Sequence, residues 1–566
     1  MNRRRFLESS AVAGAGVIAT SAGCAPSSPP APDSAASSAN APSPATTAAG
    51  APAAGSTRVT GTEPFELHEA TVDSLQEGMR TGALTARRIT ELYLARIEAL
   101  NTHGPELRAI IETNPDALVI ADQLDAERKA GKVRGPLHGI PIALKDNLDT
   151  HDRMTTTAGS LALEGSIPPK DSFVAAKLRA AGAILIAKAN MSEWAYWRGL
   201  NASSGWSGRG GQGRNPYALD RTTCGSSSGS GAAAAANLAA LTVGTETGGS
   251  IIFPSSIMGV VGVKPTVGLW SRSGIIPISH SQDSAGPMTR TVRDAAILLN
   301  AACGVDARDP STVASHGKSH ADYTTFLDPA GLNGARLGIV RNIPGFDARV
   351  LRVFELAIDD MKAMGAVIVD PANLPNMDAG SVFQALPLVV LNYEFKANIN
   401  KYFQSLGPTA PVKSLTELIA FNDKHPDREM PYFGQERLIE SEATTGLDDP
   451  RYLKALASVQ RWTRTDGIDA LMAKHNLDAI VAPTAGPAWL IDHIRGDRFD
   501  GGDSAGTAAI AGYPDITVPM GQVAGLPVGV SFFGRAWSEP TLFKLAYAYE
   551  QATKRRQVPT FVPTLG

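Results

Sequence analysis

Two clusters of serine and glycine in the middle of the chain contain the residue types needed for nucleophilic catalysis. Residues 225–231 read GSSSGSG, and residues 244–250 read GTETGGS. A serine hydroxyl becomes a nucleophile when a base takes its proton, and glycine lets backbone N–H groups approach a developing oxyanion. Such composition is also typical of flexible linkers. Because both clusters adjoin strongly apolar segments, we favour a folded site.

A lysine upstream of both clusters has the sequence context of a base. Lys145 ends the apolar run at 140–144 and is followed by Asp146. The pKa of lysine in water is about 10.4, so the side chain is a base at neutral pH only where burial disfavours the ammonium. A strand ending at Lys145 would provide that burial. The alternative is an exposed lysine, or one paired with Asp146.

These segments resemble the amidase signature family, and within it the bacterial peptide amidases. The resemblance is found in the two serine clusters, in GVVGVKPTVGL at 259–269 and in PIALKDN at 141–147, and it extends from about Leu67 to the C-terminus. It implies a serine hydrolase that cleaves carboxamide C–N bonds through an acyl-enzyme. In that family Ser250 would be the nucleophile, Ser226 a relay serine preceded by a cis peptide bond, and Lys145 the base.

The same stretch provides groups for the oxyanion and the substrate. The backbone N–H groups of Thr247, Gly248 and Gly249 are expected to form the oxyanion hole. We also expect three residues to line the substrate pocket, and these are Ser203, Trp206 and Ser227.

Two departures from the family pattern bear on the substrate. Glu246 and Ile252 stand where many members have aspartate and arginine, and the peptide amidase branch shares the glutamate and an apolar residue there. The resemblance therefore implies C-terminal peptide amides as substrates, with ammonia released. Other small aliphatic or aryl amides remain open.

Other functions were weighed against the same residues. Residues 225–229 fit the G-x-S-x-G nucleophile elbow, which would make Ser227 the nucleophile with a late histidine such as His493, but no apolar strand precedes the motif. Ser315 and Lys318 fit the S-x-x-K motif of penicillin-binding proteins, but they stand in a polar segment without partner motifs.

Two other classes of protein are also disfavoured. A ligand-binding lipoprotein on an inactive amidase fold is disfavoured because the catalytic triad is complete. A tRNA-dependent amidotransferase subunit is disfavoured by the export signal described below.

The composition is that of a large globular enzyme. The chain has 566 residues, 43% of them hydrophobic and 19% charged, and its net charge of −3 gives no electrostatic reason to expect nucleic acid. The spacing of Cys24, Cys224 and Cys303 indicates neither a disulfide framework nor a metal site. We therefore expect free buried thiols, no metal and no cofactor. No apolar run reaches the roughly 18 residues that span a bilayer.

The N-terminus has the features of an export signal. NRRRFL at residues 2–7 has the twin-arginine form, and residues 21–24 are a candidate lipobox that would lipidate Cys24. We therefore divide the chain into a signal at 1–24, a disordered Ala/Pro/Ser-rich linker at 25–60 and an amidase domain at 61–566. This organisation predicts a periplasmic protein or a membrane-anchored lipoprotein.

Alternating strands and helices must hold the catalytic residues in place. The sequence predicts an alanine-rich helix at 232–240 and a helix that Thr85 caps. Further helices are expected at 173–181 and 349–364, and strands at 140–144, 183–187, 240–243, 336–340, 366–369, 478–482, 514–519 and 527–533. This alternation predicts one α/β domain. The resemblance implies a large mixed, mostly parallel twisted sheet covered by helices.

Overall fold

The computed structural model describes residues 65–375, 377, 381–499 and 502–565. They belong to one compact unit, Arg58–Gly566. The predicted export signal and linker lie outside the described residues and stay predictions from the sequence.

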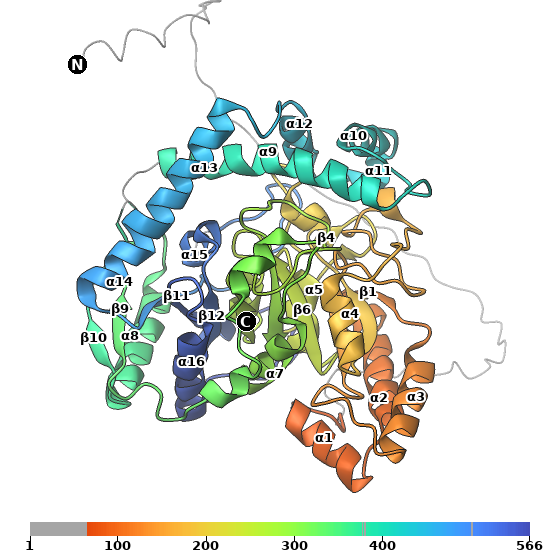
Figure 1. Cartoon of the computed structure of the whole chain (residues 1–566), viewed down its shortest axis with the longest axis horizontal. Helices are drawn as coiled ribbons and strands as arrows, with labels where there is room; N and C mark the ends of the chain where they lie inside the picture. Colours follow the sequence, from red (N-terminus) through yellow and green to blue (C-terminus); the bar gives the residue numbers. More distant parts are fainter. Residues whose placement is uncertain (1–64, 376, 378–380, 500–501, 566) are drawn as a thin grey trace, which may run out of the picture. The chain divides into compact units, whose positions relative to one another are not determined.

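One sheet of eleven strands forms the centre of this unit (Figure 1). The strand order is β1-β3-β2-β6-β8-β7-β12-β13-β11-β9-β10. The strands are β1 (Ile110–Thr113), β2 (Pro141–Lys145), β3 (Ile184–Ala189), β6 (Leu241–Glu246), β7 (Val261–Lys264), β8 (Ser284–Thr289), β9 (Arg336–Ile339), β10 (Val367–Val369), β11 (Ala479–Pro483), β12 (Asp515–Val523) and β13 (Leu526–Phe533). A separate ribbon pairs β4 (Trp206–Ser207) with β5 (Gly211–Gln212).

The predicted single domain with a large mixed sheet is confirmed. Parallel pairing joins β3, β2 and β6 on one side and β11, β9 and β10 on the other. The strands between these two blocks, from β6 through β8, β7, β12 and β13 to β11, pair antiparallel. The strands β3, β2 and β6 and the strands β11, β9 and β10 are therefore parallel, as expected for the sheet. The strands in the centre of the sheet are antiparallel and differ from that expectation.

The antiparallel centre depends on strands that the sequence pattern did not reveal. All eight predicted strands occur, within a few residues of their expected ends, whereas β1, β7 and β8 were not predicted. The sequences of β7 and β8, VGVK and SAGPMT, contain glycine and proline, which are poor strand formers. Strand β8 pairs with both β6 and β7, so it sets the direction of the sheet beside the serine clusters.

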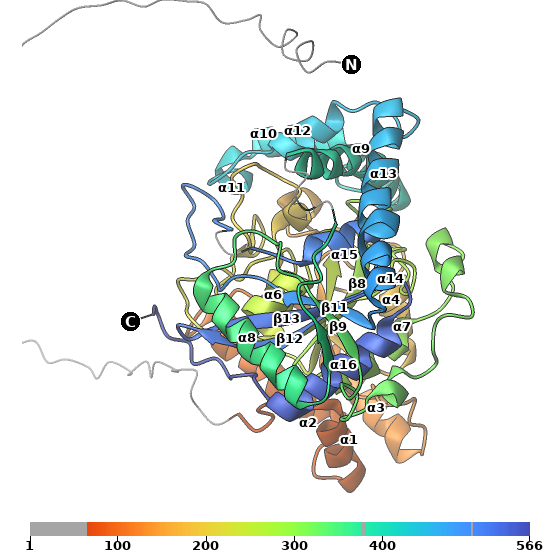
Figure 2. The same cartoon turned by 90° about the vertical axis from the view of Figure 1, so that its left-hand side faces the viewer.

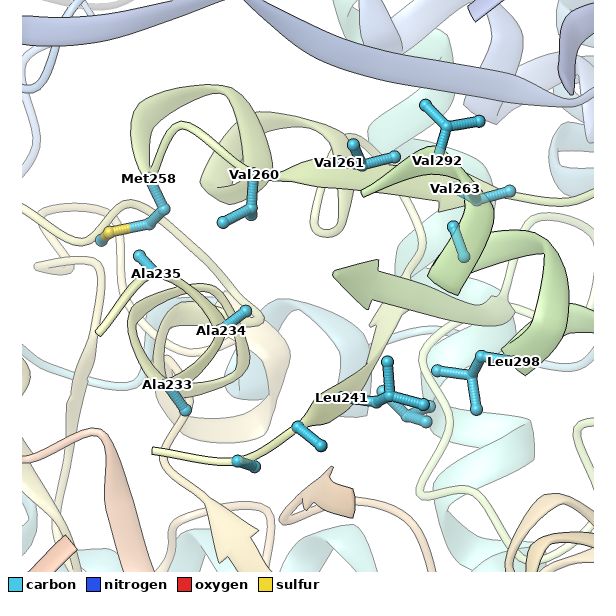
Figure 3. Packing of buried hydrophobic residues seen from close by; sticks show 14 of the residues in the cluster. Ala233, Ala234, Ala235, Leu241, Met258, Val260, Val261, Val263, Val292 and Leu298 are labelled. Carbon is cyan, nitrogen blue, oxygen red and sulfur yellow. The ribbon is translucent and has the colours of Figure 1, made fainter. Parts of the chain in front are cut away.

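The alanine-rich helix lies further upstream than predicted. Helix α5 (Ser228–Ala235) begins inside the first serine cluster and is completely buried. It ends early because Asn237 adopts a left-handed conformation with φ of 58°, after which the chain turns into β6. Figure 3 shows Ala234 and Ala235 of this helix close to Val260 and Met258. Small side chains let α5 approach the sheet closely, and this brings the first serine cluster onto a rigid element.

The remaining helices flank the sheet or gather in a separate group. Those near the sheet are α1 (Val72–Thr81), α2 (Ala86–Ile97), α3 (Ala117–Lys129), α4 (Phe173–Ala180), α6 (Ile252–Ile257), α7 (Val292–Ala302), α8 (Ala348–Ala363), α14 (Asp469–His475), α15 (Ala505–Ala511) and α16 (Glu539–Thr553). Short 3₁₀ or π turns occur at Glu98–Thr102, Leu161–Leu163, Glu193–Tyr196, Pro310–Ser315, Tyr323–Phe326 and Arg464–Ile468. As predicted, Thr85 caps α2, because its hydroxyl accepts the N–H of Arg88 at 3.0 Å.

A group of helices, α9 to α13, contacts the site region. It comprises α9 (Ser381–Ser405), α10 (Leu415–Lys424), α11 (Pro426–Glu429), α12 (Glu436–Glu442) and α13 (Pro450–Thr463), which lie at the top of Figures 1 and 2. Helix α9 packs against α10, α12 and α13. Its Tyr402 donates a hydrogen bond to Asp149 at 2.8 Å, and Phe403 packs edge-on against Trp194. In the described part of the chain no helix has the length and hydropathy to cross a membrane.

The packing around α5 makes Gly229 a sensitive position. A Cβ atom there would lie 2.2 Å from the Ala109 carbonyl oxygen and 2.5 Å from both the N and O atoms of Asn190. Gly229→Ala should therefore lower the free energy of unfolding by about 1–3 kcal/mol, measured by thermal or urea denaturation. Gly506→Ala in α15 is the control, because its nearest neighbour would lie 3.7 Å away and alanine is the better helix former. Unchanged stability of Gly229→Ala would contradict this packing.

Candidate active site

Lys145 lies at the end of β2, between β3 and β6, with its side chain inaccessible to solvent. Its Nζ atom lies 2.8 Å from the Ser226 Oγ and 3.1 Å from the Ser227 Oγ. The other two neighbours of Nζ belong to Thr245, the hydroxyl at 2.9 Å and the carbonyl oxygen at 3.1 Å. The lysine therefore bridges the first serine cluster and the start of the second.

Burial changes the acid–base behaviour of this lysine. Removal from water lowers the pKa of Lys145 to about 7, although the negative charges of Glu246 and Asp283 act in the opposite direction. Both alternatives, a lysine exposed to solvent and a lysine paired with Asp146, are wrong. The Asp146 carboxylate instead accepts the Thr157 hydroxyl and the Gly159 N–H. Near neutral pH a large fraction of Lys145 is thus the free amine, the form that accepts a proton.

Ser226 is placed to exchange protons with Lys145. The peptide bond between Gly225 and Ser226 is cis, as the resemblance implied. The Ser226 carbonyl oxygen accepts the N–H of Ser192 at 3.1 Å, which helps to fix the backbone of this residue. Its hydroxyl oxygen lies 2.8 Å from the Lys145 Nζ, so a proton can pass between the two groups.

Ser227 is engaged in structural hydrogen bonds. Its hydroxyl donates to the Thr245 carbonyl oxygen at 2.9 Å and accepts the Thr245 N–H at 3.1 Å. His493, the histidine that a nucleophile elbow would need, instead stacks on Tyr432 with ring centroids 3.9 Å apart. The elbow constellation is therefore not assembled around Ser227.

Ser250 lies in the turn between β6 and α6 and is half-buried. Its carbonyl oxygen accepts the N–H of Ser227 at 3.1 Å, so the backbone links the two serine clusters. The Glu246 carboxylate fixes the start of α6, because one oxygen accepts the N–H groups of Ile251 at 2.8 Å and Ile252 at 3.0 Å. The glutamate that departs from the family's aspartate therefore holds the residues that directly follow Ser250.

The loop before Ser250 presents backbone donors. Among the described residues, the N–H groups of Thr247 and Gly248 have no hydrogen-bond acceptor. The Thr247 hydroxyl donates to Asp283 at 2.5 Å, and the second carboxylate oxygen accepts the N–H groups of Ile278 at 2.9 Å and Ser279 at 2.8 Å. These bonds fix the loop, so the two N–H groups are available to an oxyanion.

Gly249 completes the loop in a conformation that favours glycine. Its φ is 92°, and a Cβ atom there would lie 2.5 Å from the Phe253 ring. Gly248 differs, because the space around it is open. The paired glycines thus allow both the sharp turn and a close approach to the backbone.

Two cavities flank this loop. The larger, of about 470 Å³, is lined by Thr245, Glu246 and Thr247. The smaller, of about 60 Å³, is lined by Cys224 and Phe253. The loop residues line only the larger cavity, and the smaller one includes the Phe253 ring, which lies beside Gly249.

The pocket predicted from the sequence differs from these cavities. Ser203 donates to the Gln212 side chain at 3.1 Å, and Trp206 packs edge-on against Phe433 with ring centroids 5.0 Å apart. Neither residue, nor Ser227, lines either cavity described above. Asp149 and Tyr402 also line the larger cavity, and no sequence pattern indicates them because they come from distant segments and follow no motif.

The remaining candidate residues do not form further sites. Ser315 donates to the Thr312 carbonyl oxygen at 2.7 Å, while the Lys318 Nζ lies 4.9 Å from the Trp537 ring centroid, so the S-x-x-K match has no catalytic pairing. Cys224 and Cys303 are free cysteines, the first buried as predicted and the second only partly buried. Within the described residues no group of three His, Cys, Asp or Glu side chains could hold a metal ion.

Known proteins resemble the chain over most of its length. The family model described as Amidase matches residues 88–543. A probable amidase of Arabidopsis thaliana is 40% identical over 516 residues, which cover 90% of this chain and 94% of that protein. The native peptide amidase of Stenotrophomonas maltophilia is 51% identical with a TM-score of 0.84, covering 88% of this chain and 100% of that chain. A peptide amidase structure in complex with the competitive inhibitor chymostatin aligns with the same identity, TM-score and coverage. This chain therefore belongs to the amidase signature family and is an amidase, a hydrolase of carboxamide C–N bonds.

Proposed function

We propose that this amidase removes ammonia from C-terminal peptide amides through a Ser-Ser-Lys triad. Ser250 is the nucleophile, Ser226 relays protons, and Lys145 is the base. The observation on which this proposal depends most is the buried Nζ of Lys145, 2.8 Å from the Ser226 Oγ, with its pKa lowered to about 7. A neutral amine in that position can take a proton from a serine at physiological pH.

Acylation proceeds by one connected proton transfer. The Ser250 oxygen attacks the amide carbon while its proton passes to Ser226, whose own proton passes to the Nζ of Lys145. The negative charge on the former carbonyl oxygen is stabilised by the backbone N–H groups of Thr247 and Gly248, whereas the Gly249 N–H, also expected from the sequence to contribute, bonds to the Glu246 carboxylate. When the C–N bond breaks, the proton returns through Ser226 to the leaving nitrogen. The acyl group remains as an ester on Ser250.

Deacylation uses the same groups in the same roles. Water attacks the ester and passes its proton through Ser226 to Lys145, and the C–O bond to Ser250 then breaks with return of the proton. The Lys145 amine is neutral again after each half-reaction. Lys145 carries a positive charge only while each tetrahedral intermediate exists, and this charge balances the negative charge on the oxyanion.

The peptide part of the proposal is supported by similarity. A peptide amidase is 51% identical over 88% of this chain and 100% of its own, and a structure of such an enzyme holds the competitive inhibitor chymostatin. Amides of other small aliphatic or aryl acids are the competing substrate class. Release of ammonia from a panel of peptide amides, fatty amides and aryl amides distinguishes the two, and the proposal requires the highest kcat/KM with peptide amides.

Replacing the triad residues tests the roles. Ser250→Ala should lower kcat by about 10⁴-fold or more, and Ser226→Ala and Lys145→Ala by about 10³-fold or more, since members of one relay act as a unit. Ser230→Ala is the matched control, because this buried serine of the same cluster bonds to the Val243 carbonyl oxygen and should retain nearly full activity. Melting temperatures establish that the variants are folded. Full loss in Ser227→Ala with activity retained in Ser250→Ala would contradict the assignment.

The pH dependence tests the base. Lys145 acts only when neutral, so kcat/KM should rise with pH through about 7 and then level off. A histidine could produce a similar rise of kcat/KM with pH, called the limb below. However, His138 is buried and its Nε2 lies 2.9 Å from the Leu124 carbonyl oxygen. His138→Gln should therefore keep the limb. Loss of the limb in His138→Gln, or an unchanged limb in Lys145→Ala, would remove lysine as the base.

A further inference from the structure

Helix α9 carries a buried carboxylate that the proposed mechanism does not use. The side chain of Glu394 is inaccessible to solvent, and its two oxygens accept hydrogen bonds from different elements. Its Oε1 accepts the hydroxyl of Tyr452 on α13 at 2.8 Å. Its Oε2 accepts the Ser279 hydroxyl at 2.5 Å, and the N–H and hydroxyl of Ser281 at 3.1 and 3.0 Å. The carboxylate therefore joins α9 and α13 to the loop that precedes β8.

A buried carboxylate is a costly way to join two helices to a loop. Taking the group out of water is unfavourable unless donors satisfy it, and apolar packing has no such cost. In return, hydrogen bonds to a charged acceptor are shorter and stronger than neutral ones. The His280 Nε2 lies 3.5 Å from the Glu394 Oε1, but the histidine side chain is 43% exposed, so solvent weakens that pairing. The serine contacts are therefore the part of this arrangement that fixes the loop most firmly.

Ser279 connects this carboxylate to the loop that precedes Ser250. The buried hydroxyl of Ser279 contacts Glu394, while its N–H donates to the Asp283 Oδ2 at 2.8 Å. The other oxygen of Asp283 accepts the Thr247 hydroxyl at 2.5 Å. A continuous chain of hydrogen bonds thus runs from α9 to Thr247, whose backbone N–H is one of the two donors assigned to the oxyanion.

We propose that Glu394 is a positioning residue for the oxyanion hole, which fixes the Thr247 N–H through Ser279 and Asp283. The inference rests on the proposed function, in which that N–H stabilises the oxyanion. Without the Glu394 carboxylate the Ser279 hydroxyl loses its acceptor, and the loop that holds Asp283 and Thr247 can shift. A displaced oxyanion donor weakens binding of the transition state more than binding of the substrate. Helix α9 thereby influences the chemical step.

The first test separates kcat from KM for one peptide amide. Glu394→Ala should lower kcat about 10- to 100-fold and change KM less than about threefold, because complete loss of an oxyanion donor costs about 10²- to 10³-fold. Glu394→Gln should restore kcat to within about threefold of wild type, since the amide oxygen can accept from Ser279 while the NH₂ group donates to the Tyr452 oxygen. Ser279→Ala removes the same link and should lower kcat about 10-fold, so it provides the test if Glu394→Ala does not fold. Equal losses of kcat in Glu394→Ala and Glu394→Gln would overturn the proposal.

A peptide aldehyde probes the oxyanion hole without turnover. The Ser250 oxygen bonds to the aldehyde carbon, the carbonyl π bond opens to an alkoxide, and the Ser250 proton passes through Ser226 to Lys145. This adduct mimics the tetrahedral intermediate, so its affinity follows that of the transition state. Glu394→Ala should raise the Ki of the aldehyde by about the factor by which kcat/KM falls. An unchanged Ki would overturn the proposal, because a smaller folded fraction lowers the apparent kcat without weakening the inhibitor.

A control on the same helix and a double variant show whether the effect passes through Thr247. The buried neighbour Tyr393 donates to Asp449 at 2.6 Å, at the start of α13, so Tyr393→Phe removes a hydrogen bond of α9 that does not belong to the chain. It should keep the wild-type kcat and Ki even where the melting temperature falls. Thr247→Val breaks the chain at its other end and keeps the backbone N–H. Glu394→Ala combined with Thr247→Val should be no more than about threefold slower than the slower single variant, since both interrupt one chain. Two losses of kcat that multiply would overturn the proposal.

The positioning role and the proposed function fail in different ways. If the aldehyde inhibits the wild type and modifies Ser250, while Glu394→Ala keeps the wild-type kcat and Ki, only the positioning role of Glu394 is overturned. If Ser250→Ala retains full turnover, or the aldehyde does not inhibit the wild type, the triad is overturned. The oxyanion hole built on the triad, and the role of Glu394 in it, are then overturned as well.

Discussion

The structure around the active site depends on a lysine that is kept out of water. Lowering the pKa of Lys145 from 10.5 to about 7 corresponds to roughly 4–5 kcal/mol in favour of the neutral form. This amount counts against folding below about pH 7, where the lysine of an unfolded chain is protonated, and it disappears above pH 10.5. The Nζ donates hydrogen bonds to the hydroxyls of Ser226, Ser227 and Thr245, and these bonds offset part of the cost. The rest must come from the packing of the sheet and of α5, which holds these groups together.

Strand β6 connects the elements that this arrangement requires. It pairs with β2, which delivers Lys145, and with β8, which directly follows Asp283. At its end Glu246 fixes the first residues of α6, while Asp283 fixes Thr247. The proposed nucleophile, the donor loop and the proposed base are thus positioned by neighbouring strands. This rigidity is what an enzyme needs to stabilise charge that appears only in the transition state.

The sequence predicted the elements that follow clear periodic patterns and the residues that stand in motifs. The apolar run before Lys145 predicts a buried strand. The serine and glycine content of the two clusters predicts that they form one site, because few other roles suit these residue types. The sequence did not reveal β8, because glycine and proline hide a strand that only pairing with β6 and β7 stabilises. It placed Trp206 in a substrate pocket, although the side chain packs against aromatic residues of a distant segment. The walls of the large cavity come from segments as far apart as β6 and α9, and no local pattern records such contacts.

In the proposed mechanism, neutral Lys145 activates Ser250 through Ser226. The most direct measurement is the rate at which a fluorophosphonate labels the enzyme as a function of pH, with the modified residue identified by peptide mass mapping. We expect a label on Ser250, a rate that reaches half its maximum near pH 7, and a rate reduced by orders of magnitude at every pH in Lys145→Ala. A label on Ser227, or the same pH-dependent rate in Lys145→Ala, would show that Lys145 is not the base that activates Ser250.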